Sequence, residues 1–191
     1  LNYYRDNLDI AMRKETELFF GHILDHNLPL REFLAADYSF LNRELAEHYG
    51  MTGLEGNHFR KVSLPPASRG GILGHASFLT ASANGVDTSP VVRGIYVLNK
   101  LLGYTPPSPP DDVPTIEPDV RGATTLREQL IKHRADVTCA QCHNKIDPPG
   151  FALENFDAIG AWRDQYPSKL KVDASGKLPA GKSFTSNAEF R

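Results

Sequence analysis

The stretch Cys139-Ala140-Gln141-Cys142-His143 contains both cysteines of the 191-residue chain and ends on a histidine. A C-x-x-C-H sequence is typical of c-type haem attachment. Cys139 and Cys142 are three residues apart, so on a helical turn their thiols face one side and can form thioethers with two vinyl groups on one porphyrin edge. His143 follows directly and can bind the iron as the proximal axial ligand. We therefore expect one haem c, attached covalently through Cys139 and Cys142.

Three other uses of a Cys-x-x-Cys pair explain the stretch less well. A thioredoxin-like redox pair belongs to a βαβ pattern, which the surrounding sequence lacks. A structural zinc site needs four ligands, and the chain has only these two cysteines, so scattered histidines would have to complete it. A short disulfide is compatible with an exported protein but gives His143 no role.

The residues that follow the motif predict the wall of a haem pocket. The haem helix is expected to begin near Asp136 or Thr138, and Asp147-Pro148-Pro149-Gly150 is expected to end it sharply. A carbonyl fixed by these prolines could accept Nδ1–H of His143 and orient the ring. Arg163 could pair with a haem propionate, and the alternative is that it forms an exposed ion pair. The predicted cofactor contacts beyond the motif are Pro148, Phe151, Phe156, Trp162 and Arg163.

The sixth iron position is the open question of this site. No Met or His follows His143, so a distal ligand must come from upstream or from sequence outside this chain, or be absent. His75 is the first choice, because glycines and apolar residues surround it and permit close approach to a flat ligand. A packed histidine bonded to the backbone is the structural alternative for His75. Met51 and His58 follow as weaker distal candidates; a Met ligand would raise the potential, and an open site would allow peroxide chemistry.

The rest of the chain predicts a mainly α fold: an irregular helical, cytochrome c-like domain with long loops and a small C-terminal β-hairpin. Apolar residues at helical spacing, with capping signals, mark its helices. Residues 104–118 hold six of the fourteen prolines and form an extended strap, which we expect to run along the surface of its own domain. The elements expected are helices at 5–27, 28–49, 89–102 and 124–133, an irregular stretch at 50–69, a hairpin within 170–184 and the start of a helix at 187–191.

Composition and charge exclude several classes of function. The chain is 40% hydrophobic and 23% charged, as in ordinary globular proteins, and its net charge of −2 indicates neither nucleic acid nor an anionic membrane as a partner. No apolar run approaches the roughly 18 residues of a transmembrane span. The chain begins at Leu1 with no apolar signal region, so we expect it to be cut from a longer protein. Because bacteria attach haem c outside the cytoplasm, we expect an upstream export signal and a periplasmic or cell-envelope location.

Several stretches resemble planctomycete-type cytochrome domain proteins, which are large secreted bacterial proteins of mostly unassigned function. The resemblance is specific over residues 139–162 (CAQCHNKIDPPGFALENFDAIGAW) and also covers 124–133, 70–77 and the proline strap. Residues 34–50 and 172–179 resemble the end of a preceding helical module and the start of a following one. The resemblance implies a fragment of a multidomain protein, with a PSCyt-like haem module and PSD-like flanking modules. The expected domains are a helical segment at 1–65, the haem module at 66–168, including the strap, and the start of another module at 169–191.

Two functions compete on this sequence. The first is an electron-transfer module whose six-coordinate haem passes single electrons to or from an attached dehydrogenase module or a partner protein. The second is a peroxidase-like haem enzyme with an open iron, in which His75 or Arg93 would be the distal acid–base group. A non-redox scaffold with a vestigial motif is the weakest alternative. Since no other catalytic motif occurs in the chain, the sequence favours electron transfer, while enzyme activity stays open.

Overall fold

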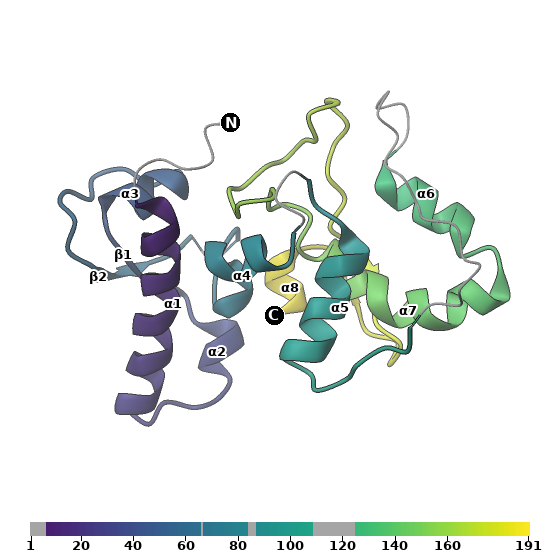
Figure 1. Ribbon diagram of the computed structural model, residues 1–191, viewed down its shortest axis with the longest axis horizontal. Helices are drawn as coiled ribbons and strands as arrows, with labels where there is room; N and C mark the ends of the chain where they lie inside the picture. The colour runs from purple at the N-terminus through teal and green to yellow at the C-terminus, as the bar shows by residue number, and fades with distance from the viewer. Residues whose placement is uncertain (1–6, 66, 84–86, 109–124) are drawn as a thin grey trace.

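The computed structural model describes residues 7–65, 67–83, 87–108 and 125–191, and it is mainly helical (Figure 1). This confirms the predicted fold class, including the small C-terminal hairpin. Most of the proline strap, from residue 109 on, lies outside the described residues. No described helix combines the length and hydrophobicity needed to cross a bilayer. The helices are α1 (Leu8–Asp25), α2 (Glu32–Ala35), α3 (Arg43–His48), the 3₁₀ turn η1 (Ile72–Gly74), α4 (Ala76–Ala81), α5 (Pro90–Lys100), α6 (Leu126–His133), α7 (Val137–Phe151) and α8 (Asn187–Phe190), and the strands are β1 (Tyr38–Leu41), β2 (Arg60–Ser63), β3 (Gly176–Lys177) and β4 (Ser183–Phe184).

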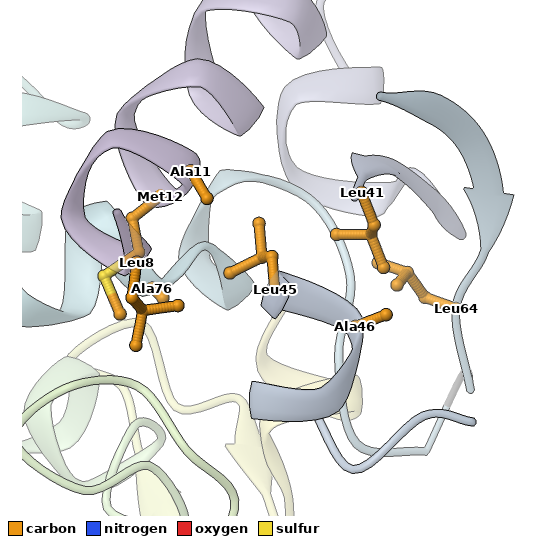
Figure 2. Packing of buried hydrophobic residues seen from close by; sticks show 8 residues of the cluster. All are labelled: Leu8, Ala11, Met12, Leu41, Leu45, Ala46, Leu64 and Ala76. Atoms are coloured by element: carbon orange, nitrogen blue, oxygen red, sulfur yellow. The ribbon is translucent and has the colours of Figure 1, made fainter. Parts of the chain in front are cut away.

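The first part of the chain forms an apolar cluster against the N-terminal part of α1 (Figure 2). One face of α1 is apolar, and it packs on the antiparallel pair β1–β2 and on α3. The first residue of α4 also reaches this cluster, so the cluster extends beyond the β1–β2 pair to α4. The buried members are Leu8, Ala11, Met12, Leu41, Leu45, Ala46, Leu64 and Ala76.

The predicted helix at 28–49 is wrong in its middle, where the chain forms β1. Ala36 has an extended backbone, with ψ at 135°, which ends the short α2. Asn42 then accepts a hydrogen bond from the backbone N–H of Leu45 at 3.0 Å, so α3 begins there as a separately capped helix. Strand β1 lies between these points and pairs with β2. Strand β2 lies inside the stretch 50–69, which was expected to be irregular. The predicted stop at Gly50 is confirmed by its φ of +72°.

The second part of the chain is built on the crossing of α5 and α7. As predicted, Ser89 caps α5 by accepting from the N–H of Val92, and a proline follows at the first helical position. The prediction that Asp147-Pro-Pro-Gly ends the haem helix is wrong, because α7 continues through Pro148 and Pro149. Because proline has no backbone N–H, the carbonyls of Asn144 and Lys145 lose their helical hydrogen bonds. Both residues are exposed, so water can replace the missing donors.

Two glycines allow α5 and α7 to touch backbone to backbone. A Cβ on Gly94 would lie 1.8 Å from the carbonyl oxygen of Ile146, and a Cβ on Gly150 would lie 1.8 Å from that of Pro90. No side-chain movement relieves such contacts, because the clashing atoms belong to the main chain. This packing holds α7, and the motif on it, in a fixed position against α5.

We expect Gly94→Ala to lower the free energy of unfolding by about 2–3 kcal/mol, since the added methyl group forces the two helices apart. Gly21→Ala is the matched control: it is also a helical glycine, but a Cβ added there would meet no atom within 4 Å. The control should raise stability by up to about 1 kcal/mol through helix propensity. Urea unfolding measures both changes. Equal stabilities of the two variants would contradict the close packing.

Candidate haem-attachment site

The C-x-x-C-H motif lies in the first two turns of α7. Asp136 caps this helix: its Oδ1 accepts hydrogen bonds from the N–H groups of Thr138, at 2.7 Å, and Cys139, at 3.3 Å. These bonds lower the pKa of Asp136. Cys139 and Cys142 are free thiols, both half-buried, three residues apart on the helix. The local structure therefore places the two sulfurs on one side of α7, as the spacing predicts.

His143 is held by a carboxylate on its own helix. Its Nδ1 lies 2.9 Å from Oδ1 of Asp147, four residues on. The Asp147 side chain is fully buried, whereas 16% of the His143 side chain is exposed. In the neutral tautomer that donates Nδ1–H to this carboxylate, Nε2 carries the lone pair that a ligand site needs. A carboxylate thus takes the role that the sequence assigned to a proline-fixed carbonyl.

Helix α6 supplies the other neighbours of this histidine. The rings of His133 and His143 meet edge to face, with centroids 5.0 Å apart. Nε of Arg134 lies 3.6 Å from Oδ2 of Asp147, and neither of these two buried atoms has a hydrogen-bond partner within the described residues. Sequence reasoning missed Asp147 and Arg134. The i,i+4 spacing of His143 and Asp147 would have indicated the first, had the helix not been expected to stop there.

A small cationic cavity of about 420 Å³ opens beside this cluster. Arg134 and Lys177 line it together with Asn144, the residue after His143. Pro148 and Phe151, both predicted to contact the cofactor, also lie here, and the guanidinium of Arg127 stacks 3.8 Å from the ring centroid of Phe151. The structure therefore places two of the predicted apolar residues in one cavity with three cations.

The other predicted wall residues gather in a different part of the fold. Phe156 is fully buried, and its ring meets that of Trp162 edge to face at 5.3 Å. Arg163 donates to the carbonyl of Glu154 at 3.0 Å and to Oγ1 of Thr88 at 2.7 Å. These contacts favour a structural role for Arg163 over the predicted pairing with a propionate.

His75 lies in a buried polar network that joins the N-cap position of α4 to α1 and β1. Its side chain is fully buried; Nδ1 lies 3.0 Å from Oγ1 of Thr16, and Nε2 lies 3.4 Å from Oγ of Ser39. Ser39 also donates to Glu15 at 2.7 Å, and Tyr49 donates to the other oxygen of Glu15 at 2.5 Å. Both ring nitrogens of His75 thus face groups of the first 50 residues, which favours the structural alternative over distal iron ligation.

The weaker distal candidates also have partners in the N-terminal part of the chain. Met51 packs against the apolar cluster at the N-terminal part of α1, and the ring of His58 contacts the guanidinium of Arg60. Neither contact involves α7. The described residues therefore bring Cys139, Cys142 and His143 together with Asp147, but they do not bring Met51, His58 or His75 to that group. Nor do they contain a cluster of three or more His, Cys, Asp or Glu side chains arranged for a metal ion.

The buried imidazole of His75 predicts an acid-sensitive fold. Burial lowers the pKa of His75 below its ordinary 6.5; Glu15 opposes this shift, and the cation of Arg69 adds to it. Below pH 6.5 the unfolded chain takes up a proton that the folded chain resists, so the free energy of unfolding falls as the pH drops through that value. His48, whose pKa is also lowered by burial, contributes in the same direction.

We expect His75→Gln to reduce the loss of melting temperature between about pH 7.5 and pH 5, because glutamine has no proton to gain. Thermal unfolding at both pH values checks this. His26→Gln, at an exposed position, is the control, and its melting temperature should fall as much as that of the unmodified chain. An equally steep loss in His75→Gln would show that other groups cause the acid sensitivity.

The comparisons with protein families find two matching family models. The family model PSCyt3, described as a protein of unknown function (DUF1588), matches residues 69–166, and PSD4, also described as a protein of unknown function (DUF1592), matches residues 1–51. Both names belong to the planctomycete cytochrome-type families that the sequence resembles, so the resemblance is confirmed at that level. No curated protein and no solved structure matches the chain.

Proposed function

We propose, from the premise that the chain belongs to the PSCyt3 family, that it is a c-type cytochrome module with one covalent haem for single-electron transfer. One observation carries this proposal: the two free thiols and His143 share the first turns of α7, and Asp147 holds Nδ1 of that histidine. A thioether pair and an oriented imidazole are the protein groups that haem c requires.

The donor set fits this cofactor. Cys139 and Cys142 would hold the porphyrin, and Nε2 of His143 would bind its iron. In place of Arg163 we assign Arg134 and Lys177 to the propionates, because they line a cavity together with Asn144, the residue after His143, and the buried Nε of Arg134 has no hydrogen-bond partner among the described residues. When bound, the haem supplies a one-electron couple between ferric and ferrous iron. The protein's own part is to orient His143, to bury the site and to balance its charge.

The surroundings of Arg93 and His75 support electron transfer over the peroxidase-like alternative. A distal acid–base group must face an open iron. Arg93 is fully buried and directs its guanidinium at three backbone carbonyls, and His75 directs both nitrogens at Thr16 and Ser39. Neither side chain is arranged to meet peroxide at the iron.

The proposed cofactor also determines where the protein works. Since haem c is attached outside the bacterial cytoplasm, we place the module in the periplasm or cell envelope, within a larger exported protein. Its electrons would pass to or from an attached dehydrogenase module or a separate redox protein.

Absorption spectra of the oxidised and reduced protein test the proposal, using material exported from a strain with haem-maturation machinery. We expect a low-spin spectrum that neither carbon monoxide nor cyanide changes. A high-spin iron that binds both readily would support the peroxidase-like alternative. Exported protein without haem would overturn both functions.

Asp147→Asn tests the orienting carboxylate. An amide still accepts from Nδ1–H but donates less charge to the imidazole, so the ferric state loses stabilisation. We expect the midpoint potential to rise by about 60 mV, a tenfold change in the one-electron equilibrium. Spectroelectrochemical titration measures it. Glu17→Gln, at an exposed position on α1, is the control and should leave the potential unchanged. An equal potential in Asp147→Asn would mean that Asp147 does not tune the iron.

A further inference from the structure

A long apolar groove of about 950 Å³ runs between the N-terminal and C-terminal parts of the molecule. Its walls come from α1, α2 and η1, from the end of α5, from α7 and from the C-terminal segment, and Figure 1 shows where these elements lie. The lining is mostly aliphatic and aromatic. Typical members are Phe20, Leu30, Phe33, Leu98, Leu102 and Phe190.

Large apolar side chains remain exposed along this groove. Phe20, Leu102 and Leu30 are 48, 61 and 81% exposed, and all three line it. A single exposed leucine is ordinary, but several gathered around one concave surface mark a binding site. The volume also lies in the range of about 300–1,000 Å³ that is typical of small-molecule sites.

The lining also contains three cationic side chains, those of Lys100, Lys145 and Arg191. Lys100 is in the last turn of α5, and Nζ of Lys145 lies 5.5 Å from the ring centroid of Tyr104. All three residues line the groove, and none of its lining residues is acidic. Within the described ranges, neither lysine has a carboxylate partner. A ligand that fits both features has an apolar body and an anionic head.

The groove adjoins α7, the helix that carries the proposed haem site. Lys145 and Pro149 represent α7 in its lining, and they follow His143 by two and six residues. At 3.6 residues per turn they lie roughly 200° and 240° around the helix from His143. Cys142, which precedes Lys145 and Pro149 by three and seven residues, lies on the same face of α7 as these two residues, but the groove lining contains no residue of the C-x-x-C-H motif.

We propose that this groove binds a single-chain amphiphile with an anionic head, such as a fatty acid. The chain lies along the apolar walls, and the head contacts Lys100 and Lys145. A second copy of the protein fits less well, because a two-fold contact pairs this surface with itself and the lining offers the lysines no carboxylate. The proposal is independent of the electron-transfer function.

Isothermal titration of the exported protein with three amphiphiles of equal chain length tests the proposal: dodecanoate, dodecanol and dodecyltrimethylammonium. We expect dodecanoate to bind one to one, at least tenfold more tightly than the cationic amphiphile. Replacing both lysines, in Lys100→Met/Lys145→Met, should abolish this preference while binding of dodecanol is retained. Equal affinity of the unmodified protein for the anionic and cationic amphiphiles would overturn the proposal.

Leu102→Glu places a carboxylate in the groove, and Leu24→Glu is its matched control. The two leucines are 61 and 59% exposed, but only Leu102 lines the groove. We expect Leu102→Glu to weaken dodecanoate binding at least tenfold and Leu24→Glu to leave it unchanged. Equal losses in both variants would overturn the assignment. So would a dimer in sedimentation that dodecanoate does not dissociate, since it would assign the groove to a second copy.

Discussion

Replacing both Cys139 and Cys142 by serine is expected to abolish covalent haem attachment completely. Serine cannot form a thioether, and the chain contains no other thiol. Each single variant keeps one sulfur and should yield a small amount of protein with one thioether. The mass of the denatured, exported chain measures attachment directly: one porphyrin mass in the unmodified protein, none in the double variant.

The fold should survive this change, so lost attachment can be separated from misfolding. Both thiols are half-buried and unpaired, and surface substitutions of this kind typically change stability by less than about 0.5 kcal/mol. Gln141→Ala, at the exposed position between the cysteines, is the control and should carry haem normally. If the unmodified exported chain contains a disulfide or bound zinc in place of porphyrin, the proposed function fails.

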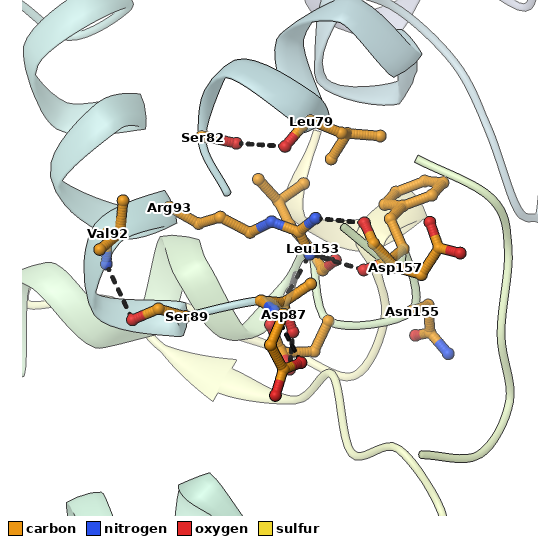
Figure 3. A network of polar contacts seen from close by, with 12 residues as sticks. Leu79, Ser82, Asp87, Ser89, Val92, Arg93, Leu153, Asn155 and Asp157 are labelled. Atoms are coloured by element: carbon orange, nitrogen blue, oxygen red, sulfur yellow. Dashed lines mark hydrogen bonds and ion pairs between the residues drawn. The ribbon is translucent and has the colours of Figure 1, made fainter. Parts of the chain in front are cut away.

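Arg93→Met is expected to lower the free energy of unfolding by about 3–5 kcal/mol, as when one partner of a buried ion pair is removed. Arg93 reaches from α5 to the turn after α7 (Figure 3). It donates to the carbonyls of Leu153 at 2.8 Å, Phe156 at 2.6 Å and Asp157 at 2.6 Å. Its Nη1 also lies 3.7 Å from the buried carboxylate of Glu154.

The charge of Arg93 persists in the folded protein. Burial lowers its pKa to about 10, with Glu154 opposing that shift, so the guanidinium stays protonated at neutral pH. Methionine would leave three carbonyls without this donor and the carboxylate of Glu154 without this nearby cation. Arg13→Met removes an exposed pair on α1 and should cost less than about 1 kcal/mol. Urea unfolding distinguishes the two variants; equal costs would show that the Arg93 network contributes little to stability.

Local sequence signals predicted the elements that depend on neighbouring residues. The cap at Ser89, the stop at Gly50 and the C-terminal hairpin follow from such signals. Strand β1 could not be predicted in this way, because its stability comes from pairing with residues about 20 positions further along the chain. The leucines around it repeat at helical spacing, and long-range pairing outweighs that local preference.

The site shows the same division between local and long-range information. The spacing of Cys139, Cys142 and His143 placed them on one side of a helix. Helix α7 continues through two prolines because it packs against α5, which lies more than 40 residues earlier in the chain. The position of Asp147 depends on this continuation. The partners of His75 come from residues 15–39, so its flanking glycines alone could not show that its nitrogens are occupied.

The buried network of Glu15 and His75 constrains how this protein can evolve. Recombination within residues 52–68 would separate the part matched by PSD4 from the part matched by PSCyt3. One product would then expose the carboxylate of Glu15. The other would expose the imidazole of His75 without Thr16 and Ser39, its hydrogen-bond partners. We therefore expect the two parts to stay together in one chain. An exchange of either part alone should require compensating substitutions at Glu15 and His75.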